Sequence, residues 1–266
     1  QITDEKAIKT AEERFSALLR RQLERVERLK EEGSPVDYSE LDKLIVGVCG
    51  GDGIGPYICA SAQKVMEFLL ADKIAAGKVE IRQIDGLTIE RRVEVMKAIP
   101  DDTLAELKDC HVILKGPTTT PKKGDPWPNI ESANVAMRKE LDLFANVRPV
   151  RVPELGIDWT FFRENTEGSY ALGSDGFNVT EDLAMDFCVA TSQGTERILR
   201  AGFEHARKTG AGYVSVVTKA NIIKTTDGRF LSIAEKVAED YPDVKWDDWF
   251  IDIMTAKLID PARRSA

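Results

Sequence analysis

Short apolar runs alternate with segments of helical periodicity along most of this chain, and this alternation is the pattern that most constrains its fold. The runs with the length and composition of buried strands are residues 44–49, 79–84, 110–116, 212–218 and 244–251, with a further strand predicted at 185–191. Buried parallel strands are almost continuously apolar, and the crossover between them is usually a helix. The pattern therefore predicts an α/β fold with a largely parallel sheet, whose ligands gather at the carboxyl ends of the strands.

A heavily charged segment, residues 4–32, precedes the first of these strands. Its apolar residues recur at helical spacing among Glu, Arg and Lys, and it stops at Gly33-Ser34-Pro35. This periodicity predicts one long amphipathic helix within an N-terminal helical extension of residues 1–40. Two interpretations stay open: an arm that packs on a partner subunit, and a helix that lies across its own domain.

The composition is that of an ordinary globular protein. The chain has 266 residues, 42% of them hydrophobic and 31% charged, which leaves room for a sizeable core. Its net charge of −8 and the absence of a long apolar run argue against nucleic-acid and membrane partners. Four widely spaced cysteines are expected to be buried free thiols rather than disulfides or zinc ligands: Cys49, Cys59, Cys110 and Cys188.

Two loops that follow predicted strands are candidates for contact with small molecules. Residues 50–56 read G-G-D-G-I-G-P, and their match to the dinucleotide-binding fingerprint G-x-G-x-x-G fails at Pro56. We interpret their glycines as a tight turn that allows close backbone approach. Residues 115–121 read K-G-P-T-T-T-P; a lysine and three hydroxyl groups suit a cofactor or an anion, and a proline-punctuated turn explains them equally well.

A segment with the equipment to hold a small acid runs from Ser132 to Pro149. Ser132 can cap a helix, and Asn134 and Arg138 then lie one turn apart on the same face, near the positive end of the helix dipole. Arg148 is held in extended backbone by the following proline. The alternative is a capped surface helix with a solvated arginine.

Four more polar residues follow predicted strands or turns. An aromatic strand delivers Arg163 to its end, a polar turn presents Tyr170, and an apolar strand runs into Lys219, which can lose solvation and become a base. Asp252 opens the last segment. Each has an ordinary structural explanation too: an ion pair for Arg163, packing for Tyr170, a solvated loop for Lys219 and a helix cap for Asp252.

Six motifs occur together and in a characteristic order. They are G-D-G-I-G-P at 51–56, L-K-G-P-T-T-T-P at 114–121, S-A-N-V-A-M-R with L-D-L-F-A-N-V-R-P within 132–149, F-R-E-N-T-E-G-S-Y at 162–170, T-K-A-N-I-I-K at 218–224, and F-I-D-I-M at 250–254. In this order they resemble the metal-dependent β-decarboxylating 2-hydroxyacid dehydrogenases, the family of isocitrate, 3-isopropylmalate, homoisocitrate and tartrate dehydrogenases. The resemblance covers about residues 44–260.

The resemblance implies a particular architecture. It is the isopropylmalate dehydrogenase-like three-layer α/β fold, with a large domain, a smaller α/β domain and a dimer clasp. The expected bounds are 41–143 for the N-terminal half of the large domain and 144–266 for the small domain, including a clasp near 168–191. The C-terminal part of the large domain, which carries two further metal carboxylates and the adenosine loop in relatives, is not found in this sequence.

The resemblance also implies the role of each candidate residue. Tyr170 and Lys219 match the proton-handling pair, with Lys219 assisting removal of the hydroxyl proton and Tyr170 protonating the enolate carbon. The remaining matches are Arg138, Arg148 and Arg163 for the substrate carboxylates, Ser132 and Asn134 for the choice of acid in the manner of isocitrate enzymes, Thr119, Thr120 and Asn134 for the nicotinamide end of the cofactor, and Asp252 for the metal.

The implied reaction is the oxidative decarboxylation of isocitrate to 2-oxoglutarate, a tricarboxylic acid cycle step. It needs NAD or NADP, with NAD favoured, and Mg²⁺ or Mn²⁺. The implied assembly is a homodimer with shared active sites, in the cytoplasm or, after loss of a transit peptide, in the mitochondrial matrix. Homoisocitrate, tartrate and 3-isopropylmalate dehydrogenases are the alternatives within the family, and a noncatalytic subunit or truncated binding module is the alternative of another class.

Overall fold

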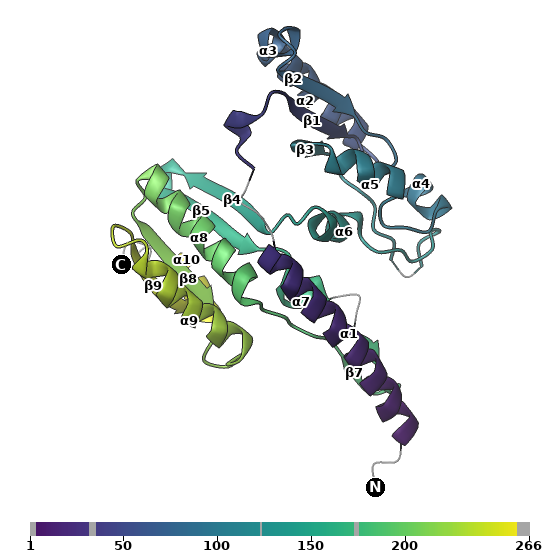
Figure 1. The fold of residues 1–266 in the computed structure, drawn as a ribbon, viewed down its shortest axis with the longest axis vertical. Coiled ribbons are helices and arrows are strands. Elements are labelled where there is room, and N and C mark those ends of the chain that lie inside the picture. The colour runs from purple at the N-terminus through teal and green to yellow at the C-terminus, as the bar shows by residue number, and fades with distance from the viewer. Residues whose placement is uncertain (1–3, 32–35, 123, 173–175, 260–266) are drawn as a thin grey trace. The chain divides into compact units, whose positions relative to one another are not determined.

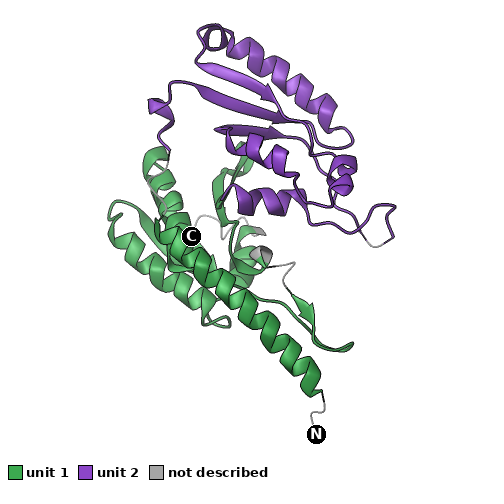
Figure 2. Cartoon of the chain, turned by 45° about the vertical axis from the view of Figure 1, so that its right-hand side comes forward, with its two compact units in different colours: residues 1–32, 143–266 green, residues 33–142 purple. Residues whose placement is uncertain are grey.

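The protein, described here by a computed structural model, consists of two compact units. The structure describes residues 4–31, 36–122, 124–172 and 176–259. Unit 1 contains residues 1–32 and 143–266, and unit 2 contains residues 33–142 (Figure 2). The chain therefore passes between the units twice, between residues 32 and 33 and between Asp142 and Leu143. The domain bounds at 40/41 and 143/144 and the clasp near 168–191 stay predictions.

Unit 2 is built on a three-stranded parallel sheet with strand order β2-β1-β3. The strands are β1 (Leu44–Cys49), β2 (Val79–Gln83) and β3 (Val112–Lys115), and the helical elements are η1 (Tyr38–Glu40), α2 (Gly55–Leu69), α3 (Ala71–Ala75), α4 (Ile89–Glu94), α5 (Asp101–Lys108) and α6 (Ala133–Glu140) (Figure 1). The predicted parallel pairing is confirmed here. The apolar residues from Ile89 to Ile99 favour a single helix. Instead α4 ends at Glu94, because Met96 has a left-handed backbone (φ 52°) that an α-helix does not continue through.

The core of unit 2 lies where the helices meet the carboxyl ends of the strands. Its buried members are Cys49, Ile84, Leu87, Ile99, Leu107, Ala136 and Met137. Two of these residues, Ala136 and Met137, belong to α6. The helix that carries the predicted acid-binding residues is therefore anchored by its own apolar face, which turns its polar face away from the core.

Unit 1 combines antiparallel and parallel pairs. The strands are β4 (Ala145–Val152), paired antiparallel with β5 (Ile157–Glu164), β6 (Phe177–Asn178), paired antiparallel with β7 (Ala184–Met185), and β8 (Tyr213–Thr218), paired parallel with β9 (Lys245–Phe250). Its helical elements are α1 (Glu5–Glu31), η2 (Pro153–Leu155), α7 (Gly168–Ala171), α8 (Ser192–Thr209), α9 (Thr226–Glu239) and α10 (Ile251–Ile259). The strand predicted at 185–191 is wrong, since only Ala184–Met185 is strand.

The predicted N-terminal helix forms as α1 and packs against its own unit. It contacts α8, the ring of Phe15 lies 5.6 Å from that of Phe187, and Arg25 Nη1 lies 2.8 Å from Glu167 Oε1. Of the two interpretations left open by the sequence, these contacts match the helix that lies across its own domain.

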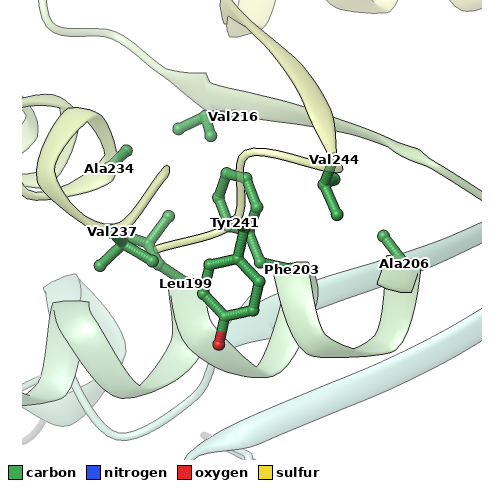
Figure 3. Packing of buried hydrophobic residues seen from close by; sticks show 8 residues of the cluster. All are labelled: Leu199, Phe203, Ala206, Val216, Ala234, Val237, Tyr241 and Val244. Atoms are coloured by element: carbon green, nitrogen blue, oxygen red, sulfur yellow. The ribbon is translucent and has the colours of Figure 1, made fainter. Parts of the chain in front are cut away.

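The main core of unit 1 lies between α8, α9 and the β8–β9 pair (Figure 3). It is centred on Phe203, which has no solvent exposure and whose ring lies 5.3 Å from that of Tyr241. The other buried members are Leu199, Ala206, Val216, Ala234, Val237 and Val244. This packing holds the β8–β9 pair, and the residues at its carboxyl end, in place.

Of the four cysteines expected to be buried free thiols, three are buried or half-buried and one is exposed. Cys49 and Cys59 are buried, Cys110 is half-buried and Cys188 is exposed. Burial raises the pKa of the Cys49 thiol to about 12, so Cys49 stays protonated at neutral pH. The expectation of burial is wrong for Cys188 because the strand predicted around it does not form. Over the described part of the chain, no helix is both long and apolar enough to cross a membrane.

Candidate active site

The first group of predicted site residues lies at the N-terminus of α6 in unit 2. Ser132 occupies the N-cap position with extended backbone, and its carbonyl oxygen accepts a hydrogen bond from Ala136 N. Its hydroxyl oxygen does not cap the helix but accepts a hydrogen bond from Thr120 Oγ1, at 3.3 Å. A residue predicted to choose the acid thus contacts a residue predicted to bind the nicotinamide.

Asn134 and Arg138 lie on the side of α6 that faces away from the core. Ala133, Ala136 and Met137 are buried, whereas Asn134 is exposed and Arg138 is half-buried. Residues four apart in a helix are neighbours on its surface, which gives Asn134 and Arg138 a shared polar face. This face can offer an amide and a guanidinium to one anionic ligand.

The loop that bears the predicted cofactor contacts is fastened to the glycine turn after β1. Thr119 N donates to Asp52 Oδ2 at 2.6 Å, and Asp52 N donates to Pro117 O at 2.8 Å. Gly51 has a φ of 69°, and a Cβ there would lie 2.1 Å from Pro117 O. The glycine therefore serves close approach between two backbones, as the sequence predicted.

Lys115 fixes the start of the same loop. It ends β3, and its Nζ donates to Gly116 O at 2.8 Å and to Thr118 Oγ1 at 3.0 Å. Burial lowers the pKa of the Lys115 ammonium group. From the sequence, Lys115 is predicted only as part of a loop that suits an anion. In the structure its ammonium group is half-buried and donates hydrogen bonds within that loop.

The second group of predicted site residues lies in unit 1, and two of its members share a face of the β4–β5 pair. Arg163 is directly opposite Asn146, and Arg148 follows Asn146 by two residues on the same face. Diagonal neighbours in an antiparallel pair are about 7–8 Å apart. Arg148 Nε donates to Asn146 Oδ1 at 2.8 Å and Arg163 Nη2 to Asn165 Oδ1 at 3.4 Å. Arg148 and Arg163 are both exposed on this face.

Lys219 and Asp252 meet at the carboxyl end of the β8–β9 pair. Lys219 follows the last residue of β8, and Asp252 lies in the first turn of α10, directly after β9. Lys219 Nζ donates to Asp252 Oδ1 at 2.6 Å, and Lys219 N donates to Asp227 Oδ2 at 2.7 Å. The two predicted residues are therefore in direct contact within one chain, and Asp227 fixes the backbone beneath them.

We expect the carboxyl group of Asp252 to titrate below the value of about 3.9 that an unpaired aspartate has. The hydrogen bond from Lys219 is the main cause that holds the pKa of Asp252 low. Any stability that this contact provides is complete above the unfolded pKa and is lost as pH falls through the lower, folded pKa. NMR titration of the Asp252 carboxyl carbon measures that midpoint. In Lys219→Met the midpoint should rise toward that of an unpaired aspartate; an unchanged midpoint would assign the effect to another group.

Tyr170 lies in α7, and its side chain is outside the described residues. The segment that leads to it is firmly held. Glu164 accepts hydrogen bonds from Thr166 N and Glu167 N, and the buried Glu167 accepts one from Thr191 N at 2.8 Å. With the ion pair from Arg25, these contacts tie the segment to both α1 and the start of α8. The sequence indicated none of them.

The described residues contain no group of three or more His, Cys, Asp or Glu side chains that could hold a metal ion. Asp252 is exposed and provides a single carboxylate, already paired with Lys219. Mg²⁺ is bound in nearly octahedral geometry by oxygen ligands, with one or two protein carboxylates and several waters or substrate oxygens. The donor set in this part of the chain therefore does not make a metal site on its own.

A pocket of about 150 Å³ opens beside the glycine turn, between the carboxyl ends of β1 and β2. Its polar lining includes Gln63, Gln83, Asp85 and Thr88. None of the predicted site residues lines it, so the pocket is separate from the α6 group.

Comparison with known proteins places this α/β chain in a family. Its fold matches the crystal structure of isocitrate dehydrogenase from Methylococcus capsulatus, with a TM-score of 0.68 and 32% identity over 83% of this chain and 64% of that one. Residues 45–264 match the family model of isocitrate/isopropylmalate dehydrogenase. The chain belongs to this family.

Two curated relatives show the range of the family around this chain. One is a probable isocitrate dehydrogenase [NAD] subunit alpha, mitochondrial, from Caenorhabditis elegans, 35% identical over 87% of this chain and 63% of its own length. Another is the homoisocitrate dehydrogenase of Methanocaldococcus jannaschii, 34% identical over 80% of this chain and 62% of its own length. The chain thus spans less than two thirds of the length of these relatives.

Proposed function

We propose that this protein is a β-decarboxylating hydroxyacid dehydrogenase and that its substrate is isocitrate. The observation that carries the proposal is the contact between Thr120 and Ser132 at the N-terminus of α6. Hydride transfer requires the nicotinamide ring and the hydroxyl-bearing carbon of the acid to lie side by side. A threonine proposed to contact the ring and a serine proposed to contact the acid lie within 3.3 Å of each other, which supports that arrangement.

Each unit by itself presents guanidinium groups suited to the carboxylates of the acid. Arg138 provides one guanidinium beside Asn134 on α6, and Arg148 and Arg163 provide two more on one face of β4–β5. Guanidinium groups bind carboxylates through two parallel hydrogen bonds, and a substrate with three carboxylates can use several such groups. Ser132 and Asn134 can donate hydrogen bonds to a polar substituent, which favours isocitrate over an acid with an apolar side chain.

Proton transfer would use Lys219 and Tyr170. An ammonium group has no lone pair, so Lys219 must lose its proton, and its pair with Asp252 must open, before its nitrogen can accept the proton of the substrate hydroxyl. Tyr170 would then deliver a proton to the carbon that loses carbon dioxide. NAD or NADP supplies the hydride acceptor when bound, near Thr119, Thr120 and Asn134.

Three further points belong to the same proposal. NAD is favoured over NADP because the C. elegans relative is an NAD enzyme by name. A Mg²⁺ or Mn²⁺ site would need Asp252 together with ligands from outside the described residues, so no catalytic step is assigned to a metal. We also propose a homodimer, and a cytoplasmic or mitochondrial location.

The test is turnover of four acids by the full chain with Mn²⁺ and either NAD or NADP. Isocitrate should have the highest kcat/KM, above homoisocitrate, tartrate and 3-isopropylmalate. Ser132→Ala should reduce that preference, while Ser215→Ala, at an exposed residue of β8, should not. A higher kcat/KM for homoisocitrate than for isocitrate would overturn the choice of substrate.

A noncatalytic subunit is the second candidate, and one observation favours it. Within the described residues the carboxylates do not assemble a metal-binding group. A subunit of this kind would bind isocitrate, as measured by calorimetry, and would show no turnover with any of the four acids.

A further inference from the structure

Arg92 is a fully buried arginine in α4, and its guanidinium donates hydrogen bonds to three backbone carbonyl oxygens. It has no solvent exposure. Its Nε donates to Ala98 O at 2.8 Å, its Nη1 to Thr119 O at 2.7 Å and its Nη2 to Glu131 O at 3.0 Å. Removing a guanidinium from water is costly unless its donors are satisfied, so a buried arginine of this kind is retained where its contacts matter. The carbonyls that it binds come from widely separated parts of unit 2.

Asp52 holds the same peptide segment from the other side. Its Oδ2 accepts from Thr119 N at 2.6 Å, while Arg92 donates to Thr119 O. The second oxygen, Oδ1, accepts from Ile89 N at 2.7 Å, at the start of the helix that carries Arg92. The amide of Thr119 is therefore held by the Asp52 carboxylate and its carbonyl by the Arg92 guanidinium. Both groups are attached to α4, because Arg92 belongs to this helix and Asp52 accepts a hydrogen bond from the amide of its first residue, Ile89.

The third hydrogen bond of Arg92 connects Thr119 and its two partners to the start of α6. Glu131, whose carbonyl binds Nη2, directly precedes Ser132, the N-cap residue of α6. One guanidinium thus joins the two ends of the segment that leads from Thr119 to α6. The hydrogen bond between Thr120 and Ser132 lies next to both attachment points.

We propose that Arg92 and Asp52 are positioning residues that set the distance between the cofactor-binding threonines, Thr119 and Thr120, and the acid-binding end of α6. The inference rests on the proposed function for the roles of Thr119, Thr120 and Ser132. Neither Arg92 nor Asp52 is assigned a contact with substrate or cofactor. A planar fork with donors in fixed directions suits this task, because it ties several carbonyls in one geometry, and a lysine cannot reproduce it.

The experiment compares Arg92→Lys with Arg91→Lys in the full chain. Arg91 is the neighbouring residue of α4, is partly exposed and pairs with Glu94 and Asp102, so its replacement controls for loss of an arginine from this helix. Amide hydrogen exchange of peptides covering 117–122 and 130–134 reports the proposed contacts directly. We expect exchange in both peptides to quicken roughly tenfold in Arg92→Lys, the effect of losing about one net hydrogen bond. Peptides from β1 and α5 should be unchanged.

Turnover provides the second readout. In Arg92→Lys, KM for the nicotinamide cofactor and KM for the acid should rise together by about tenfold, with kcat changed less, because ground-state positioning of both ligands is lost. A purely structural role would lower the melting temperature without moving both constants. In the control variant Arg91→Lys neither constant should move.

The outcomes separate this inference from the proposed function. Unchanged exchange at 117–122 and 130–134 in a folded Arg92→Lys protein overturns the inference, whatever the activity. Absence of turnover in the unmodified chain overturns the proposed enzyme, while the exchange measurement still decides the role of Arg92. If Arg92→Lys does not fold, Asp52→Asn replaces it: faster exchange at 117–122 supports the inference and wild-type exchange there rejects it.

Discussion

Lys219→Met is expected to lower kcat by about a thousandfold, within the range of roughly 10²–10⁴ for loss of a general acid or base. Methionine keeps much of the length of lysine and cannot carry a proton, so the amine chemistry at the end of β8 is lost. KM for the acid should change little if Arg138, Arg148 and Arg163 bind the substrate carboxylates. The measurement is steady-state turnover of isocitrate, with circular dichroism to show that the variant is folded.

Lys224→Met provides a matched control for this prediction. Lys224 belongs to the same T-K-A-N-I-I-K motif, is exposed and should be replaceable without loss of activity. Added ammonium or methylamine should restore part of the lost rate in Lys219→Met, because a free amine can replace the missing group. A Lys219→Met protein with more than a tenth of the wild-type kcat would remove Lys219 from the proposed reaction.

Phe203→Ala is expected to lower the free energy of unfolding of unit 1 by about 3–5 kcal/mol, the usual cost of removing a buried phenylalanine. Phe203 has no solvent exposure, and its ring lies against Tyr241 in the core that joins α8, α9 and β8. The cavity left behind would not collapse fully, because the surrounding side chains belong to regular elements. Urea unfolding followed by tryptophan fluorescence suits this measurement, since Trp246 packs against the same core.

The control is Phe161→Ala, at a ring in the same unit that is 44% exposed. It should cost clearly less than Phe203→Ala, since a partly exposed ring gives up less burial and leaves a smaller cavity. The two compact units can unfold separately, so a probe in unit 2 is recorded alongside. A loss below about 1 kcal/mol for Phe203→Ala, the size of an average substitution, would show that this core is not what stabilises unit 1.

Much of the fold follows from residue patterns. The apolar runs at 44–49, 79–84, 110–116, 212–218 and 244–251 all correspond to strands within two residues of their predicted ends. The run at 185–191 does not: among the described residues only its first member, Met185, pairs with a strand, and Val189 forms just an isolated bridge with Gly168. The left-handed residue Met96 shortened one helix without any glycine to announce it.

The candidate site was predictable where strand ends decide position. Lys219 and Asp252 follow strands that turned out to be parallel neighbours, and the carboxyl ends of such strands lie at one edge of the sheet. Asp52 also carries a signal in the sequence. It stands within the glycine turn, where an acid beside close-packed backbone can accept the amides that the turn leaves unpaired.

Arg91 and Arg92 mark the limit of what the chain's residue order determines. The sequence determined the α/β pattern, the family motifs and the strand ends on which Lys219 and Asp252 lie, because these depend on local propensity and on period. It did not separate two adjacent arginines in a charged helix. Tertiary packing left Arg91 partly exposed in ion pairs and buried Arg92 against three carbonyls. Burial depends on which distant segments fold over a residue, and only the assembled unit decides that.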